Sequence, residues 1–197
     1  APASTPQIRS LALLHRPVIA GELQLQASAG ALLATLLDTA TVPRWAARVS
    51  NVEVLSFTPP ADYLVRSWLS FPPPLSDREL ISRSQHGWYQ GDLYLQVTSV
   101  AAGIAADPER PRIEHAAFCW QARPLADGGL RLRYYSAVEL APWLPRWLTT
   151  PLAEAAVAQT LNALPQAVAA HRHRALSDIP LLAVPLTPLC QLLASQR

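Results

Sequence analysis

Alternation of polar and apolar residues is clearest near the start of the chain, over residues 18–29. Within it, Glu22–Ala27 follows a strict period of two, which predicts a half-buried strand. The spacing then becomes helical, because the four leucines of Ala31–Thr39 fall on one face of a helix. A second short helical stretch is expected at Pro43–Trp45. The leucine-rich segment Ile8–Arg16, which precedes all of these, predicts a further short helix.

The middle of the chain has the pattern of antiparallel strands separated by turn residues. Proline and aspartate mark the turn Pro59–Asp62, and Asp127–Gly129 is a hairpin signal. Short strands at such close spacing are typical of a curved sheet or an open barrel. The predicted strands are Asn51–Pro59, Tyr63–Phe71, Glu79–Ser84, Gly91–Val100, Ile113–Arg123 and Leu130–Val138.

The longest helical pattern runs from Leu152 to Arg174. Thr149–Pro151 predicts its start, because threonine caps helices and proline favours the first helical position. Pro165 lies inside the pattern and is expected to kink or split it. Two adjoining apolar stripes follow the helix, one of Leu152, Ala156, Ala163 and Ala167 and one of Val157, Leu161, Leu164 and Val168. The segment Ile179–Arg197 shows no assignable period.

Together these elements predict an α+β fold in which a curved antiparallel sheet wraps around one long C-terminal helix. A single helix on a curved sheet tends to leave a space beneath it, and the small residues Ala156, Ala163 and Ala167 would enlarge that space. Small residues also permit close packing. The pattern alone therefore leaves both an internal cavity and a solid core open.

The composition is unusually apolar for a chain of 197 residues. Half of the residues are hydrophobic and 15% are charged, against about 25% in typical soluble domains. This excludes global disorder, and no apolar run is long enough to predict a membrane-spanning helix. The excess must lie in a core, a cavity or an exposed patch. A net charge of +2 on scattered arginines gives no reason to expect a nucleic-acid partner.

The first residues and the two cysteines bear on the compartment. Residues 1–6, APASTP, resemble the stretch that follows a signal-peptidase site, so we expect a periplasmic or secreted protein, with the cytoplasm as the alternative. Cys119 and Cys190 allow at most one disulfide. Two buried thiols are the preferred interpretation.

Four segments, in order, resemble the START domains, the steroidogenic-acute-regulatory-related lipid-transfer family of the helix-grip superfamily, and we expect a bacterial member. The most specific is FPPPLSDRELI at Phe71–Ile81, which is similar to the family signature PxPLSxRDFV. The others are Val42–Val49 with its tryptophan, Arg112–Leu125, and Tyr134–Leu148 with its WLPRWL entry to the last helix. The resemblance implies a START-like domain over 18–175, an N-terminal extension 1–17 containing the short helix, and a tail 176–197.

The resemblance also implies an activity. START domains bind one lipid or sterol in an internal tunnel and move it between membranes without chemistry, cofactor or metal. We therefore expect a monomeric carrier of a hydrophobic small molecule (lipid, sterol or fatty acid-like) that contacts a membrane surface transiently. Polyketide aromatase/cyclases share the fold, so a cyclase or hydrolase is the alternative. No nucleophile elbow, phosphate loop or metal-binding spacing occurs in the sequence.

Some family members bury an Arg–Glu pair in the cavity, where ungapped matching places Val65 and Ser84 in this chain. If these two face inward, the strand period brings their alternate neighbours with them, and Arg131 and Arg133 on the last strand should face solvent. The predicted cavity residues are Tyr63, Val65, Ser67, Leu69, Leu80, Ser82, Ser84, Leu93, Leu95, Leu132, Tyr134, Ser136, Leu152, Ala156 and Ala163.

Three residues before the long helix suggest membrane contact. The indoles of Trp143 and Trp147 suit a bilayer interface, and Arg146 between them could meet lipid phosphate. The alternative is that both tryptophans pack beneath the start of the helix.

Overall fold

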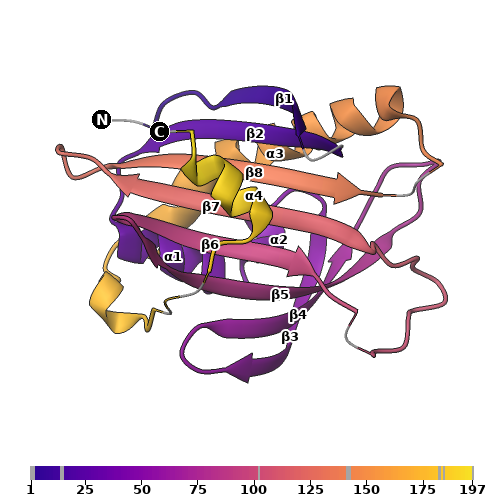
Figure 1. Ribbon diagram of the computed structural model, residues 1–197, viewed down its shortest axis with the longest axis horizontal. Coiled ribbons are helices and arrows are strands. Elements are labelled where there is room, and N and C mark those ends of the chain that lie inside the picture. Colours follow the sequence, from indigo (N-terminus) through magenta and orange to yellow (C-terminus); the bar gives the residue numbers. More distant parts are fainter. Residues whose placement is uncertain are drawn as a thin grey trace.

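Eight antiparallel strands form one sheet that curves around a long helix in the computed structural model (Figure 1). The structure describes residues 3–13, 16–101, 103–140, 143–181, 183 and 185–196, so the first two residues of the export-like N-terminus lie outside it. The strands are β1 (Gln7–Leu13), β2 (Arg16–Leu25), β3 (Val49–Thr58), β4 (Asp62–Leu69), β5 (Arg78–Tyr89), β6 (Asp92–Ser99), β7 (His115–Pro124) and β8 (Leu130–Glu139). The helices are α1 (Ala29–Leu37), α2 (Val42–Trp45), α3 (Arg146–Ala169), the 3₁₀ turn η1 (Leu176–Asp178) and α4 (Pro188–Ala194).

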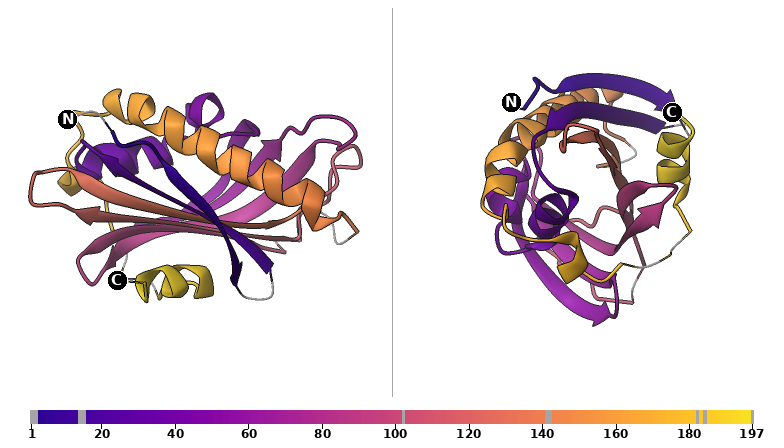
Figure 2. Two further views of the ribbon diagram at one scale, coloured as in Figure 1. Left: turned by 90° about the horizontal axis from the view of Figure 1, so that it is seen from above. Right: turned by 90° about the vertical axis from the view of Figure 1, so that its left-hand side faces the viewer.

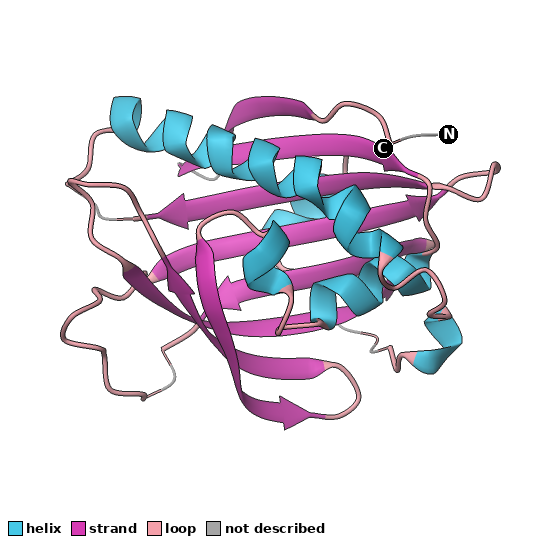
Figure 3. Ribbon diagram, turned by 180° about the vertical axis from the view of Figure 1, so that it is seen from behind, coloured by secondary structure: helices cyan, strands magenta, loops and turns pink. Residues whose placement is uncertain are grey.

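The strand order is β1-β2-β8-β7-β6-β5-β4-β3, which leaves β1 and β3 as the two edges. Helix α3 crosses the concave face of the sheet, with α1 and α2 beside it (Figure 3). The end-on view in Figure 2 shows the sheet bending around an interior that α3 closes on one side. The predicted α+β arrangement of a curved sheet and one long helix is confirmed.

The predicted helix over Ile8–Arg16 is wrong, because this segment contains strand β1. Its residues pair with β2 throughout, from Gln7 opposite Glu22 to Leu13 opposite Arg16. Three leucines within a short segment fit either period, and the unpaired backbone groups of β2 decide between them. The division of the chain at residues 17 and 175 stays a prediction.

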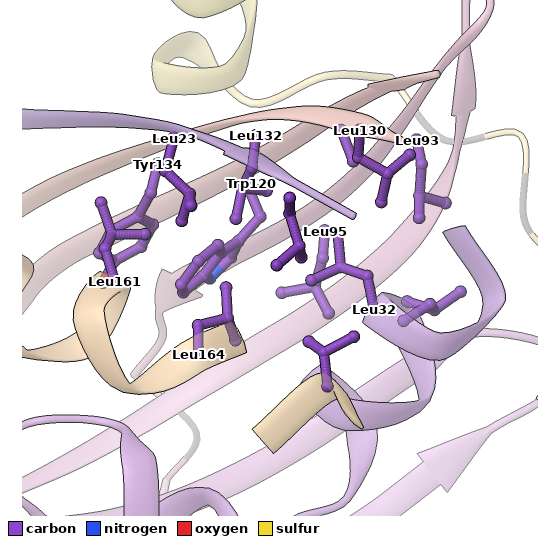
Figure 4. Packing of buried hydrophobic residues seen from close by; sticks show 14 of the residues in the cluster. Leu23, Leu32, Leu93, Leu95, Trp120, Leu130, Leu132, Tyr134, Leu161 and Leu164 are labelled. Atoms are coloured by element: carbon purple, nitrogen blue, oxygen red, sulfur yellow. The ribbon is translucent and has the colours of Figure 1, made fainter. Parts of the chain in front are cut away.

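The main core lies between the concave face and α3 (Figure 4). Leu23 and Leu132 from the sheet meet Leu161 and Leu164 of α3, and each of these side chains is at most 1% exposed. The second apolar stripe of the helix therefore faces the core as the spacing predicted. Gly21 on β2 allows α3 to approach, since a Cβ there would lie 2.3 Å from Leu161 Cδ1.

Helix α3 begins before the predicted cap at Thr149–Pro151. It starts at Arg146 and continues through both Pro151 and Pro165 to Ala169, so Pro165 does not split it. Each interior proline costs a helix about 3 kcal/mol, which the burial of a long apolar face outweighs. No helix among the described residues has the length and hydropathy needed to cross a bilayer.

The tail packs on the convex face of the sheet, opposite α3 (Figure 1). Helix α4, capped by the Thr187 side chain, buries Leu189 and Leu193 against Tyr94 and Tyr135. Cys190 forms a disulfide with Cys119 of β7. The preference for two free thiols is therefore wrong, because a tail without periodicity gave no means to place Cys190 beside β7.

Candidate functional site

Two adjoining pockets lie between the concave face of the sheet and helix α3. The large pocket, of about 210 Å³, extends from α1 and α2 to strands β3–β7. The small pocket, of about 100 Å³, lies beneath the first half of α3. Five residues line both: Ala47, Leu69, Phe118, Tyr134 and Thr160. Small-molecule sites span about 300–1,000 Å³, so the two pockets together reach the lower end of that range.

Most of the predicted cavity residues lie around these pockets. Those that line the large pocket are Tyr63, Val65, Ser67, Leu69, Leu80, Ser82, Ser84, Leu95 and Tyr134. The small pocket is lined by Leu69 and Tyr134 again, and by Ser136, Leu152 and Ala156. The strand register explains why they meet, since Val65 pairs with Ser82 and Tyr63 with Ser84 in adjacent strands.

Three predicted cavity residues line neither pocket. Leu93 and Leu132 point to the same side of the sheet as the pocket residues, but they are buried in the core beneath Leu32 of α1 and Leu164 of α3 (Figure 4). Ala163 packs against the same cluster. The strand period predicts which face of the sheet a residue lies on, but it does not predict how far the pockets extend along that face. Around Leu93 and Leu132, side chains of α1 fill the space over the sheet.

Several lining residues escaped the sequence prediction. They come from α1, α2, β3 and β7, and include Leu36, Leu37, Trp45, Val49, Val52, Phe118 and Trp120. Alternation on β7, with Phe118 and Trp120 on either side of Cys119, was a usable signal for two of them. The α1 and α2 residues carried none, because only the folded crossover between β2 and β3 brings them over the sheet.

Aromatic rings form much of the wall between the pockets. Trp120 stacks on Tyr134 with 3.8 Å between ring centroids, and Trp45 meets Trp120 edge-on at 6.3 Å. Burial raises the pKa of the Tyr134 hydroxyl far above its ordinary value, partly offset by a hydrogen bond with Ser136. Tyr134 is therefore a neutral hydroxyl at physiological pH, able to donate and accept a hydrogen bond.

The polar side-chain groups that line the pockets are hydroxyls, the indole nitrogens of Trp45 and Trp120, and one guanidinium. Ser67, Ser82 and Ser84 line the large pocket, and Arg48 lines the small one. Among the described lining residues there is no aspartate, glutamate or histidine. Within the described part of the chain, no group of three or more acidic, histidine or cysteine residues is placed to hold a metal ion. The arrangement suits a ligand that is mainly apolar.

A buried carboxylate lies close to the pockets without lining them. Glu79, 1% exposed, contacts Arg112 at 2.7 Å and Arg66 at 3.0 Å. Its neighbour Leu80 turns the other way and lines the large pocket. Glu79 thus fixes the start of β5 from outside the pockets.

The two tryptophans around the start of α3 are exposed. Trp143 and Trp147 have 75% and 76% of their surface accessible, and Arg146 between them is exposed too. The alternative in which both indoles pack beneath the helix is therefore wrong. One turn further along, Thr149 and Thr150 line the small pocket, so the exposed indoles stand near its rim.

A curved antiparallel sheet that grips a long C-terminal helix over an apolar space is the helix-grip fold of START domains. The structure is similar to that of a STAR-related lipid transfer protein from Xanthomonas axonopodis, with a TM-score of 0.72 and 21% sequence identity. The match covers 83% of this chain and 92% of that one. Human StAR-related lipid transfer protein 5 matches at a TM-score of 0.74 and 12% identity, over 85% of this chain and 83% of that one.

An enzyme occurs among the similar structures as well. The Zhui aromatase/cyclase from Streptomyces sp. R1128 matches over 85% of this chain and 94% of its own, at a TM-score of 0.53 and 15% identity. No protein-family model and no curated protein sequence matches the chain. The comparisons thus define a fold that serves both hydrophobic ligand transfer and aromatase/cyclase chemistry.

Proposed function

We propose that the protein binds one hydrophobic ligand, a lipid, sterol or fatty acid-like molecule, in the two adjoining pockets and transfers or sequesters it unchanged. The observation that carries this proposal is the lining itself: apolar and aromatic walls with a few hydroxyls, beneath a helix that closes the sheet. A site of this kind binds by excluding apolar surface from water and orients its ligand with one or two hydrogen bonds.

The fold of lipid-transfer proteins supports the same function. The exposed Trp143 and Trp147, near the rim of the small pocket, are suited to insert at a membrane interface while a ligand passes. The proposed working form is a monomer. An oxidising compartment, periplasmic or extracellular, is also proposed, and the Cys119–Cys190 disulfide supports it.

The proposal is tested by ligand retention. The purified protein is incubated with a total lipid extract, separated from free lipid and measured by native mass spectrometry. We expect one hydrophobic molecule per protein. Ala156→Phe places a ring in the small pocket and should reduce retention, whereas Ala155→Phe, on the exposed side of the same helix, should not. A protein that retains no lipid would refute the proposal, and so would equal retention by both variants.

A cyclase-type enzyme is the second candidate, favoured by the structural match to the aromatase/cyclase. It would need groups that move protons inside the pockets, where the titratable side chains among the described lining residues are Tyr63, Tyr134 and Arg48. Burial raises the pKa of both tyrosines, which makes them poor bases near neutral pH. Turnover of a bound polyketide chain by the purified protein would establish this alternative over the carrier.

A further inference from the structure

The last residue of α2 and the turn that follows it carry two hydrogen-bond donors without partners among the described residues. Trp45 Nε1 and Arg48 Nε are both buried, and neither has a hydrogen-bond partner among the described residues. The indole and guanidinium groups can donate but cannot accept. A buried donor is normally paired, so this turn presents a demand for acceptor atoms that the protein itself does not meet.

The backbone of this turn is fixed by its neighbours. Arg48 has a φ of 68°, in the left-handed region that few residues with side chains adopt. Its carbonyl accepts a hydrogen bond from the Ser70 amide at 2.7 Å. The Ala47 amide donates to the Thr160 hydroxyl of α3 at 2.9 Å. Backbone strain that is maintained by hydrogen bonds to neighbouring elements is common at ligand-binding sites, where it fixes the orientation of a side chain.

The two residues line different pockets, and the charged donor is the one in the small pocket. Trp45 lines the large pocket, and Arg48 lines the small one together with Thr149 and Thr150. Arg48 forms no salt bridge with any described acidic residue, and no described lining residue is acidic. The described residues therefore supply no negative charge to the Arg48 guanidinium, which is the charged group in the lining of the two pockets.

We propose that the ligand is an anionic single-chain amphiphile, with its acid group held by Arg48 and the hydroxyls of Thr149 and Thr150 and its chain in the large pocket. This inference rests on the proposed function, because it requires that the pockets hold a hydrophobic ligand. An acidic head supplies acceptors and the missing negative charge at once, and carboxylate or phosphate oxygens match the guanidinium fork. An apolar cavity of about 150 Å³ holds one benzene, so pockets of this size suit one chain rather than two.

The test compares three ligands with the same twelve-carbon chain: dodecanoate, dodecyl phosphate and uncharged 1-dodecanol. The dissociation constant of each ligand from the protein of 197 residues is measured by equilibrium dialysis with labelled ligand. We expect both acids to bind about tenfold to a hundredfold more tightly than the alcohol, as a charge-assisted hydrogen bond gives. Arg48→Gln should lose this preference while keeping its affinity for dodecanol.

Arg44→Gln is the matched control, because Arg44 is an exposed arginine on α2 that lines neither pocket. It should keep the full preference for the acids. The comparison of acids with alcohol on the unmodified protein needs no variant, so it stands even if Arg48→Gln fails to fold.

Three results would overturn the inference: equal affinity for acids and alcohol, a preference that survives Arg48→Gln, or a preference lost equally in Arg44→Gln. Inorganic phosphate carries the charge without the chain and should compete only weakly. Competition as strong as that of dodecyl phosphate would show a free-anion site instead and would also overturn it. If none of the three ligands binds, the proposed function itself is refuted. If dodecanol alone binds tightly, only the inference of an acidic head group is refuted.

Discussion

Arg112 donates two hydrogen bonds to one carboxylate oxygen of Glu79, from Nε at 2.9 Å and from Nη2 at 2.7 Å. The same arginine donates to the carbonyls of Ile104 and Ala105. Because Glu79 is buried at the start of β5, this pair ties the long connection between β6 and β7 to the strand that lines the large pocket. The pair therefore fixes one wall of the site without entering it.

Removal of the buried carboxylate should destabilise the fold strongly. Glu79→Ala leaves Arg66 and Arg112 facing a site without negative charge, and we expect the free energy of unfolding to fall by about 3–5 kcal/mol. Glu53→Ala removes the exposed partner of Arg66 and should cost about 0–1 kcal/mol. Urea unfolding of both variants measures the difference, and equal losses would contradict the role assigned to Glu79.

The disulfide should hold the tail on the sheet. In the variant Cys119→Ala with Cys190→Ala, we expect the free energy of unfolding to fall by about 2–4 kcal/mol, since the link closes a loop with a sequence separation of 71 residues. Denaturant unfolding with and without reductant measures this. Reductant should destabilise the original protein but not the double variant, and a protein indifferent to reductant would disprove the prediction.

The free energy of unfolding should decrease as the pH is lowered, because of the buried His86. The pKa of its imidazole lies below the ordinary 6.5 because burial disfavours the charged ring, although a hydrogen bond with the Pro180 carbonyl partly raises it. Below pH 6.5 the unfolded chain therefore binds a proton at this site that the native protein does not, and the free energy of unfolding decreases until the lowered native pKa is reached.

His86→Gln removes this titration while keeping a donor for the carbonyl. The difference in Tm between the original protein and the variant should narrow from pH 8 to pH 5. A difference that stays constant with pH would show that His86 does not contribute. Other histidines titrate equally in both proteins and cancel in the comparison.

A methyl group at Gly21 should push α3 from the sheet. The added Cβ of Gly21→Ala would meet Leu161 Cδ1 at 2.3 Å and Val157 Cγ1 at 3.0 Å, so we expect a loss of about 1–3 kcal/mol in the free energy of unfolding. Combining it with Leu161→Ala makes room, and the double variant should lose less than the sum of the two single variants. Strict additivity in thermal unfolding would show that the close contact is not the cause.

The exposed indoles should govern membrane binding. Replacing both Trp143 and Trp147 by Ala should reduce sedimentation of the protein with vesicles of phosphatidylcholine and phosphatidylglycerol, and change the free energy of unfolding by less than about 0.5 kcal/mol. Trp88→Ala, at a partly exposed tryptophan of β5, should leave vesicle binding unchanged. Equal losses in both variants would argue against a specific contact surface.

Much of the sheet could be predicted from the sequence because alternation reports the face of each strand directly. Arg131 and Arg133 point away from the core, which places Leu132, Tyr134 and Ser136 on the concave face, as observed. The same logic placed Ser82 and Ser84 beside the large pocket. Periodicity is local information, and these positions needed nothing more.

The rest depended on contacts between distant segments. The tail has no period, and its position follows from Cys190 meeting Cys119 and from Gln96 hydrogen-bonding to the backbone at Pro185 and Thr187. The unpaired donor of Arg48 was equally invisible, because an arginine in a turn is normally solvated. Which end of the concave face stays hollow was decided by α1.

The position of α4 gives the two halves of the sheet different mechanical properties. Strands β7 and β8 are packed between α3 inside and α4 outside, whereas the outer face of the edge strand β3 is largely exposed. Amide deuterium exchange should therefore be slow across the first pair and fast along β3, where local opening costs the least free energy. Strands β7 and β8 thus form the rigid part of the sheet and β3 forms a flexible edge. The large pocket lies against this flexible edge.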